Sequence, residues 1–167
     1  PPTLHILVAQ YCVRHRRNLL TASYADDEIS QLRPEIEKNK ILFLYEMGLD
    51  PGIDHMSAMK MIDDIKSKGG TVTSFKSHCG GLIAPESDNN PWHYTISWNP
   101  RNIVLAGSAG AVYKAGNKVI TTEYHQVFEH CDTVPFPGLT ELAWYPNRDS
   151  LSYIPTYKLE SADTFIR

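Results

Sequence analysis

Residues 48–55, Gly-Leu-Asp-Pro-Gly-Ile-Asp-His, place the carboxylate of Asp50 and a rigid Pro-Gly turn directly after an apolar run. Ligands of open α/β sheets bind outside the carboxyl ends of the strands, so Asp50 is a candidate to bind a substrate ammonium or a ribose hydroxyl. The alternative is a turn residue, which is the commoner role of Asp before Pro-Gly. Asp54 is predicted to cap the helix that follows.

A second cluster, residues 77–86, contains His78, Cys79 and the pair Gly80-Gly81. The two glycines allow the backbone to approach a ligand closely or to turn sharply at a strand end. A reactive thiol needs a lowered pKa, which the sequence does not indicate, so we predict that Cys79 is a small packed side chain. His78 is predicted to lie on the surface or in a hydrogen bond at a strand end.

Two further clusters could bind anions. In residues 97–102, Ser-Trp-Asn-Pro-Arg-Asn, a predicted strand leads into a helix that begins with Pro100, and the free N–H groups of such a helix can hold an anion. In residues 145–150, Tyr-Pro-Asn-Arg-Asp-Ser, Arg148 offers the planar fork of donors that suits a carboxylate. The alternative for Arg148 is a structural ion pair with Asp149 or another acid.

The elements that must position these clusters follow from the spacing of the apolar residues. In the first part of the chain the spacing predicts a helix over 3–18, a strand over 19–23, a helix from Asp26 or Asp27 to Asn39 and a buried strand over 41–45. Pro34 is expected to be a local irregularity in the second helix. Helices that alternate with buried strands are typical of a parallel, doubly wound sheet. Neither strand precedes a Gly-x-Gly-x-x-Gly turn, so we expect the first half of a Rossmann-type domain to lie before Pro1.

The pattern changes after a boundary predicted near Tyr45 to Asp54. One helix follows, from Asp54 to the glycines at 69 and 70. Beyond it, strands are predicted over 71–77, 94–98 and 142–145, together with a hairpin formed by 112–114 and 118–120. This second part is predicted to hold an open antiparallel or mixed sheet.

The composition excludes several classes of protein. The sequence is 42% hydrophobic and 21% charged, with a formal net charge of -3, which is typical of a soluble globular protein. The one dense basic run, residues 14–17, lies at a predicted helix end, so no nucleic-acid partner is expected. No apolar run approaches the roughly 20 residues that cross a bilayer, so no membrane insertion is expected. Three widely spaced cysteines predict a reduced, cytoplasmic chain, and no histidine spacing indicates a metal.

Several long motifs in one order resemble those of the saccharopine reductases, the NADP-dependent, L-glutamate-forming saccharopine dehydrogenases. The motifs cover nearly the whole chain and comprise Thr21-Ala22-Ser23-Tyr24, 48–56, Cys79-Gly80-Gly81, Ala84-Pro85-Glu86, Asn90-Pro91, 97–102 and 145–150. The resemblance implies an oxidoreductase of lysine metabolism. Such an enzyme condenses 2-aminoadipate 6-semialdehyde with L-glutamate and reversibly reduces the imine to saccharopine with NADPH.

The resemblance also implies which residues bind the ligands. Saccharopine would contact Ser23, Tyr24, Asp50 and Arg148, and the nicotinamide side of NADP(H) would be lined by Ala22, Ser23, Leu49, Asp50, Pro51 and Ser97. The residue types suit these ligands, because carboxylates favour Arg and amines favour Asp. No His or Lys stands out by position as the proton donor, so the catalytic residue stays unknown.

The resemblance implies an α/β chain of two parts. Residues 1–47 would be the C-terminal part of a Rossmann-type NADP-binding domain, and residues 48–167 an incomplete, mixed-sheet α+β domain for substrate binding and dimerisation. A homodimer is expected, in the cytoplasm, or in mitochondria if the parent is a bifunctional lysine-degrading enzyme. The phosphate loop would lie before Pro1, and an Arg-Gly-Thr-Leu-Arg segment would begin at Arg167. We therefore expect a chain truncated at both ends and inactive by itself.

Two departures and two alternatives stand beside this interpretation. Ile83 replaces the first Pro of a Cys-Gly-Gly-Leu-Pro-Ala-Pro-Glu motif, which predicts a less rigid loop, and residues 141–144, Glu-Leu-Ala-Trp, replace a Phe-Glu-Gly stretch. One alternative is a related reductase that forms a polyamine, of the carboxynorspermidine or homospermidine type. The other is a module that only mediates oligomerisation.

Overall fold

The structure is a computed structural model that describes residues 4–95, 101, 105–129, 131–139 and 141–167. The chain divides into two compact units, Pro1–Asp64 (unit 1) and Ile65–Arg167 (unit 2). Helix α4 (Ile53–Ser67) crosses this division and confirms the helix predicted after the Pro-Gly turn. The domain boundary between residues 47 and 48 stays a prediction.

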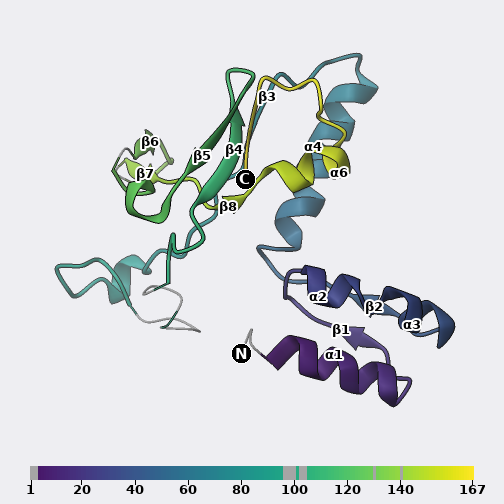
Figure 1. The fold of residues 1–167 in the computed structure, drawn as a ribbon. Helices are drawn as coiled ribbons and strands as arrows, with labels where there is room; N and C mark the ends of the chain where they lie inside the picture. The colour runs from purple at the N-terminus through teal and green to yellow at the C-terminus, as the bar shows by residue number, and fades with distance from the viewer. Residues whose placement is uncertain (1–3, 96–100, 102–104, 130, 140) are drawn as a thin grey trace. The chain divides into compact units, whose positions relative to one another are not determined.

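Unit 1 contains two short parallel strands and the helices that precede and connect them. Helix α1 (His5–Arg14) leads into β1 (Leu19–Leu20), and α2 (Asp27–Ser30) and α3 (Arg33–Lys38) lead into β2 (Phe43–Leu44), as Figure 1 shows. Leu19 pairs with Phe43 and Leu20 with Leu44. The predicted order of helix, strand, helix, strand is confirmed, although the strands are shorter than predicted.

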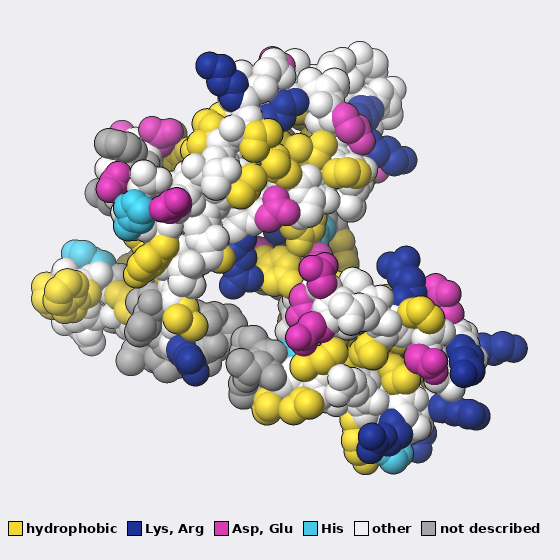
Figure 2. Space-filling model, in the orientation of Figure 1, with side chains coloured by type: hydrophobic (Ala, Val, Ile, Leu, Met, Phe, Trp, Pro, Cys, Tyr) yellow, Lys and Arg dark blue, Asp and Glu magenta, His cyan; other side chains and the backbone are white. Residues whose placement is uncertain are grey.

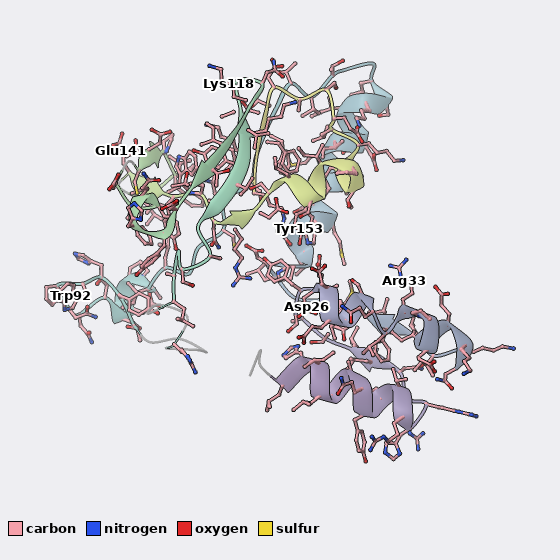
Figure 3. The ribbon with its side chains drawn as sticks, in the orientation of Figure 1. Asp26, Arg33, Trp92, Lys118, Glu141 and Tyr153 are labelled. Atoms are coloured by element: carbon pink, nitrogen blue, oxygen red, sulfur yellow. The ribbon has the colours of Figure 1, made fainter. Side chains whose placement is uncertain are left out.

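The second predicted helix is interrupted at the predicted irregularity around Pro34, which divides it into two helices, α2 and α3. Asp26 caps α2, accepting a hydrogen bond at 2.9 Å from the N–H of Ile29 to its Oδ1 (Figure 3). Pro34 is the second residue of α3. Proline lacks an N–H and its ring clashes with the carbonyl four residues earlier, so it is accommodated in a first turn. The chain therefore starts a new helix at Arg33.

Unit 1 leaves one face of its small sheet open. Leu19 and Phe43 are half-buried, whereas Leu20 and Leu44 on the opposite face are 68% and 41% exposed. Ala9 of α1 and Ile29 of α2 are buried. Figure 2 shows apolar side chains reaching the visible surface among charged ones. No described helix is long and apolar enough to cross a membrane.

Unit 2 contains a five-stranded mixed sheet, which confirms the mixed sheet predicted for this part of the chain. The strand order is β3-β9-β4-β5, and β8 also pairs with β4. The pairs β3/β9 and β4/β8 are parallel, and β4 is antiparallel to β9 and β5. The strands are β3 (Ser74–Lys76), β4 (Ala111–Ala115), β5 (Lys118–Thr122), β8 (Arg148–Asp149) and β9 (Thr164–Ile166).

The core of unit 2 gathers around three aromatic rings. Phe75 of β3 stacks on Phe165 of β9 with ring centroids 5.0 Å apart, and Tyr157 of α6 (Ile154–Tyr157) meets Phe75 edge-on at 5.3 Å. Tyr157 and Phe165 are almost fully buried. Such pairs contribute about 0.5–1.5 kcal/mol each beyond the burial of their area, so they hold the C-terminal segment on the sheet.

The predicted hairpin is confirmed as β4 and β5. Its two loop residues, Gly116 and Asn117, have φ values of 56° and 65°. This left-handed backbone is required by the tight turn whose twist matches the flanking strands. Figure 3 shows Lys118 near the tip of the hairpin, where β5 begins.

The remaining predictions for unit 2 have mixed outcomes. The strand predicted over 142–145 is β7 (Leu142–Trp144), and its antiparallel partner β6 (Asp132–Val134) was not predicted. The strand predicted over 94–98 is wrong at Tyr94 and Thr95, which are not in a strand, and its residues 96–98 lie outside the described residues. The helix start predicted at Pro100 also lies outside the described residues.

Short 3-10 helices occur at η2 (Pro85–Ser87), η3 (Tyr124–Gln126) and η4 (Leu151–Tyr153).

Candidate functional site

The segments that follow β1 and β2 run side by side at the carboxyl edge of the parallel pair. The N–H of Thr21 donates to the carbonyl of Leu44 at 2.9 Å, which continues the strand ladder. The N–H of Glu46 then donates to the carbonyl of Ser23 at 2.9 Å, and that of Met47 to the carbonyl of Thr21 at 3.1 Å. Ligands of open α/β sheets bind at this edge, so the two segments form a candidate site within unit 1.

Two glycines allow the second segment to fold back on itself. A Cβ atom on Gly48 would lie 2.9 Å from the Cβ of Ala22, and one on Gly52 would collide with the backbone of Gly48. Gly52 also has a φ of 148°, where side chains other than hydrogen are strained. The N–H of Gly48 donates to the carbonyl of Pro51 at 2.9 Å. Glycine at both positions therefore makes this turn possible, and the turn exposes Leu49 and Asp50, whereas Pro51 is buried.

Asp50 and Tyr24 meet across the two segments. The phenol Oη of Tyr24 donates a hydrogen bond of 2.9 Å to Oδ1 of Asp50. Asp50 is exposed and Tyr24 is half-buried, so the carboxylate lies at the surface with a fixed donor beside it. A carboxylate accepts through two oxygens and about four lone-pair sites, so Asp50 can accept from Tyr24 and from a ligand N–H at once.

His5, the first residue of α1, contacts both sides of the first segment. Its Nε2 lies 3.0 Å from Oγ of Ser23, and its Nδ1 lies 3.4 Å from Oγ1 of Thr21. Thr21 Oγ1 also accepts a hydrogen bond of 3.2 Å from the N–H of Ser23. Sequence reasoning missed His5, because 18 residues separate it from Ser23 and no local pattern joins them.

A second histidine closes the turn that carries Asp50. His55 Nε2 lies 2.9 Å from Oε2 of Glu46, and both side chains are largely buried. Asp54, predicted as the helix cap, is instead the second residue of α4, and its Oδ1 accepts from the N–H of Gly52 at 2.6 Å. It therefore tightens the turn before the helix rather than capping the helix from outside.

The anion-binding candidates belong to unit 2. Arg148 is exposed at the start of β8, where its N–H donates to the carbonyl of Gly110 at 2.9 Å. The neighbouring carboxylate of Asp149 accepts from the N–H of Leu151 at 2.8 Å. Ser97, predicted to line the nicotinamide, lies outside the described residues.

Cys79 and His78 follow β3. Cys79 is exposed, so the prediction of a small packed side chain is wrong: it lies in a loop after β3 beside Gly80 and Gly81, which are also exposed. The ring of His78 meets Trp144 edge-on at 5.2 Å. Burial, and secondarily the positive charge of Lys76, lowers the pKa of His78 below its ordinary 6.5. His78 is exposed overall, as predicted, with one side of its ring against Trp144, and its lowered pKa keeps the ring neutral at neutral pH.

The described part of the chain contains no group of three or more His, Cys, Asp or Glu side chains that could hold a metal ion. Unit 1 offers the exposed carboxylate of Asp50, the phenol of Tyr24 and the hydroxyl of Ser23, together with the exposed apolar side chain of Leu49. This combination suits a polar organic ligand that carries N–H donors.

Comparisons with known proteins converge on one family. The family model of the saccharopine dehydrogenase C-terminal domain matches residues 48–167. Alpha-aminoadipic semialdehyde synthase of Arabidopsis thaliana is 44% identical over 99% of this chain, and its mitochondrial counterpart of Mus musculus is 41% identical over 100%. Saccharopine dehydrogenase [NADP(+), L-glutamate-forming] of Saccharomyces cerevisiae is 38% identical over 100%.

A solved structure extends this likeness to the fold. The apo, histidine-tagged saccharopine dehydrogenase (L-Glu forming) of Saccharomyces cerevisiae matches all of this chain with a TM-score of 0.86 and 38% identity. The chain covers 38% of that structure, 37% of the yeast sequence, and 16% and 18% of the plant and mouse proteins.

Proposed function

The chain belongs to the saccharopine dehydrogenase family, and on that basis we propose that the protein containing it is an NADP(H)-dependent oxidoreductase of lysine metabolism. Its reaction is the reversible reduction of the imine of 2-aminoadipate 6-semialdehyde and L-glutamate to saccharopine. The relatives are named for the NADP-dependent, L-glutamate-forming reaction or for alpha-aminoadipic semialdehyde synthase.

The hydrogen bond between Tyr24 and Asp50 is the observation that carries this proposal. Saccharopine has a secondary amine, which is cationic at neutral pH and needs a carboxylate beside it. Asp50 supplies that charge at the edge of a parallel sheet, where ligands bind. Tyr24 fixes the orientation of the carboxylate, and Ser23 and Arg148 are proposed to bind the carboxylates of the substrate.

The cofactor proposal fits the same turn. NADPH supplies the hydride when bound, and its nicotinamide needs a flat apolar surface beside the substrate. Leu49 is 66% exposed next to Asp50, and the buried Pro51 follows Asp50. We propose that these residues, with Ala22, Ser23 and Ser97, line the nicotinamide. Residues 1–47 would then be the C-terminal part of a Rossmann-type domain, whose remaining strands and helices would cover the exposed Leu20 and Leu44.

Assembly and location are proposed with the same function. The residues of unit 2 are proposed to mediate a homodimer as well as substrate binding. The mouse relative is named as mitochondrial, so a bifunctional parent would be expected in mitochondria, and a stand-alone enzyme in the cytoplasm.

The test is turnover by the full-length protein. We expect NADPH oxidation that requires both the semialdehyde and glutamate. Asp50→Asn removes the charge and should lower kcat/KM by about 10- to 100-fold, the range for hydrogen bonds to charged groups. Asp63→Asn, an exposed carboxylate of α4, is the matched control and should retain activity.

Other outcomes would identify the alternatives. Turnover that accepts a diamine in place of glutamate would indicate a polyamine-forming reductase. A stable oligomer that neither turns over nor binds saccharopine in calorimetry would indicate an oligomerisation module and would refute the proposal.

A further inference from the structure

The hydroxyl groups of Thr21 and Ser23 are joined by one imidazole ring. His5 Nδ1 faces Thr21 Oγ1 at 3.4 Å, and His5 Nε2 faces Ser23 Oγ at 3.0 Å. All three side chains are half-buried, and His5 reaches the other two from α1. A neutral imidazole donates from one nitrogen and accepts at the other, so the tautomer of His5 decides whether Ser23 donates or accepts.

Thr21 determines that tautomer. Its Oγ1 already accepts a hydrogen bond of 3.2 Å from the N–H of Ser23. The hydroxyl proton of Thr21 therefore needs an acceptor of its own. Among the described residues, His5 Nδ1 is the one acceptor within reach of that proton. If Nδ1 accepts from Thr21, a neutral ring carries its proton on Nε2 and donates to Ser23. The opposite tautomer would leave the half-buried Thr21 hydroxyl without an acceptor, which costs free energy.

We propose that His5 is a positioning residue that fixes Ser23 as a hydrogen-bond donor to the ligand. Because Ser23 Oγ accepts from His5 Nε2, its own proton is left to be donated to a second partner. The partner of Ser23 is therefore an oxygen, either a substrate carboxylate or the carboxamide oxygen of a nicotinamide, and not a substrate amine. This assignment rests on the proposed function for the identity of the ligand, but not for the direction of the hydrogen bonds.

The first test reads the tautomer directly and needs no turnover. Histidine ring nitrogens of the full-length protein are labelled with nitrogen-15, and the signal of His5 is assigned by its loss in His5→Gln. We expect a protonated Nε2 and an unprotonated Nδ1 that accepts a hydrogen bond. A proton on Nδ1 with an unprotonated Nε2 would overturn the proposal, whether or not the protein reduces the proposed imine.

The second test asks whether His5 acts through Ser23. The side-chain amide nitrogen of Gln can occupy the place of Nε2 and donate to Ser23, whereas the shorter Asn can reach only the place of Nδ1. His5→Asn should therefore raise a KM by about tenfold with little change in kcat, and His5→Gln should stay within about threefold of the wild type. A rise in the KM of glutamate would identify a carboxylate as the partner, and a rise in that of NADPH would identify the carboxamide.

A double-mutant cycle completes the test. In a Ser23→Ala background, His5→Asn should have no further effect on the same KM. An equal, additive loss in both backgrounds would show a merely structural role and refute the proposal. Absence of turnover by the wild-type protein would instead refute the proposed function and leave the tautomer measurement to decide the role of His5.

Discussion

His55 Nε2 lies 2.9 Å from Oε2 of Glu46, with 17% and 24% of the two side chains exposed. These two residues stand at opposite ends of the turn that carries Asp50. The backbone N–H of Glu46 donates to the carbonyl of Ser23, so the same residue ties the turn to the segment after β1. The pair therefore closes the turn and fixes it relative to Ser23.

Removal of the Glu46 carboxylate should loosen this turn locally. Glu46→Ala leaves a largely buried His55 without this acceptor, which costs about 1–3 kcal/mol, whereas Glu46→Gln keeps an acceptor and should cost less. Amide hydrogen exchange of the full-length protein should accelerate about 5- to 100-fold at residues 52–54 in Glu46→Ala. The control is Asp64→Ala, which removes an exposed ion pair between Asp64 and Lys60, both on α4. Equal exchange in both variants would contradict the role of Glu46.

Gly52 should tolerate no side chain. A methyl group there meets the backbone of Gly48 and stands at a φ of 148°, so Gly52→Ala must open the turn. We expect a loss of at least about 2 kcal/mol in stability and a marked rise in the KM of NADPH. The matched change Gly80→Ala places its methyl group in open space and should leave the thermal midpoint unchanged. An unaltered midpoint in Gly52→Ala would show that the turn relaxes freely.

The sequence predicted the elements whose causes are local. The cap at Asp26 and the hairpin at Gly116-Asn117 each depend on a few neighbouring residues. Pro34 was recognised as a local irregularity, but the helical spacing on both sides of it did not show that the chain forms two separate helices there. β8 and β9 are two or three residues long and form by pairing with distant strands, so no periodicity marks them.

The site shows the same division between local and distant causes. Asp50 was identified because it follows a strand, and its place beside Tyr24 fits the motifs that contain both residues. The pairs His5 with Ser23 and Glu46 with His55 join residues 18 and 9 positions apart in the printed sequence. The first pair requires α1 to lie beside the segment after β1, and the second requires the turn at 48–52 to bring the start of α4 back to Glu46, so both depend on the tertiary structure.

Replacement of Tyr45 by Phe, which removes the hydroxyl, should not lower the stability of the protein. The hydroxyl is buried, and no described residue lies within hydrogen-bonding distance of it. Burial, with smaller contributions from Asp26 and Cys12, raises the pKa of Tyr45 to about 12. A group whose pKa is raised by folding contributes stability below its unfolded pKa, near 10, and loses it as the pH rises through about 12. Tyr45→Phe should therefore leave stability at pH 7 unchanged or raise it by up to about 1 kcal/mol.

The measurement for Tyr45 combines unfolding with an absorbance titration. Tyr45→Phe should remove a tyrosine that ionises late in the folded protein, and unfolding midpoints should be compared at pH 7. A loss of more than about 1 kcal/mol would reveal a partner for the hydroxyl and contradict its unsatisfied state.

Because of His78, the stability of the protein should fall as the pH is lowered below about 6.5. Because burial, and then Lys76, lowers the pKa of His78, the unfolded chain takes up a proton at a higher pH than the folded chain. The contribution of His78 to the stability of the folded protein is therefore complete above about pH 6.5 and is lost as the pH falls through the lower pKa of the folded state.

Lys76→Gln removes the secondary cause of the lowered pKa and should raise the pKa of His78 only partly, because the packing against Trp144 remains. Proton NMR titration of the full-length protein measures that shift, and His78→Gln should flatten the loss of stability below pH 6.5. A pKa of His78 above 6.5 in the folded protein would reverse the sign and refute this prediction.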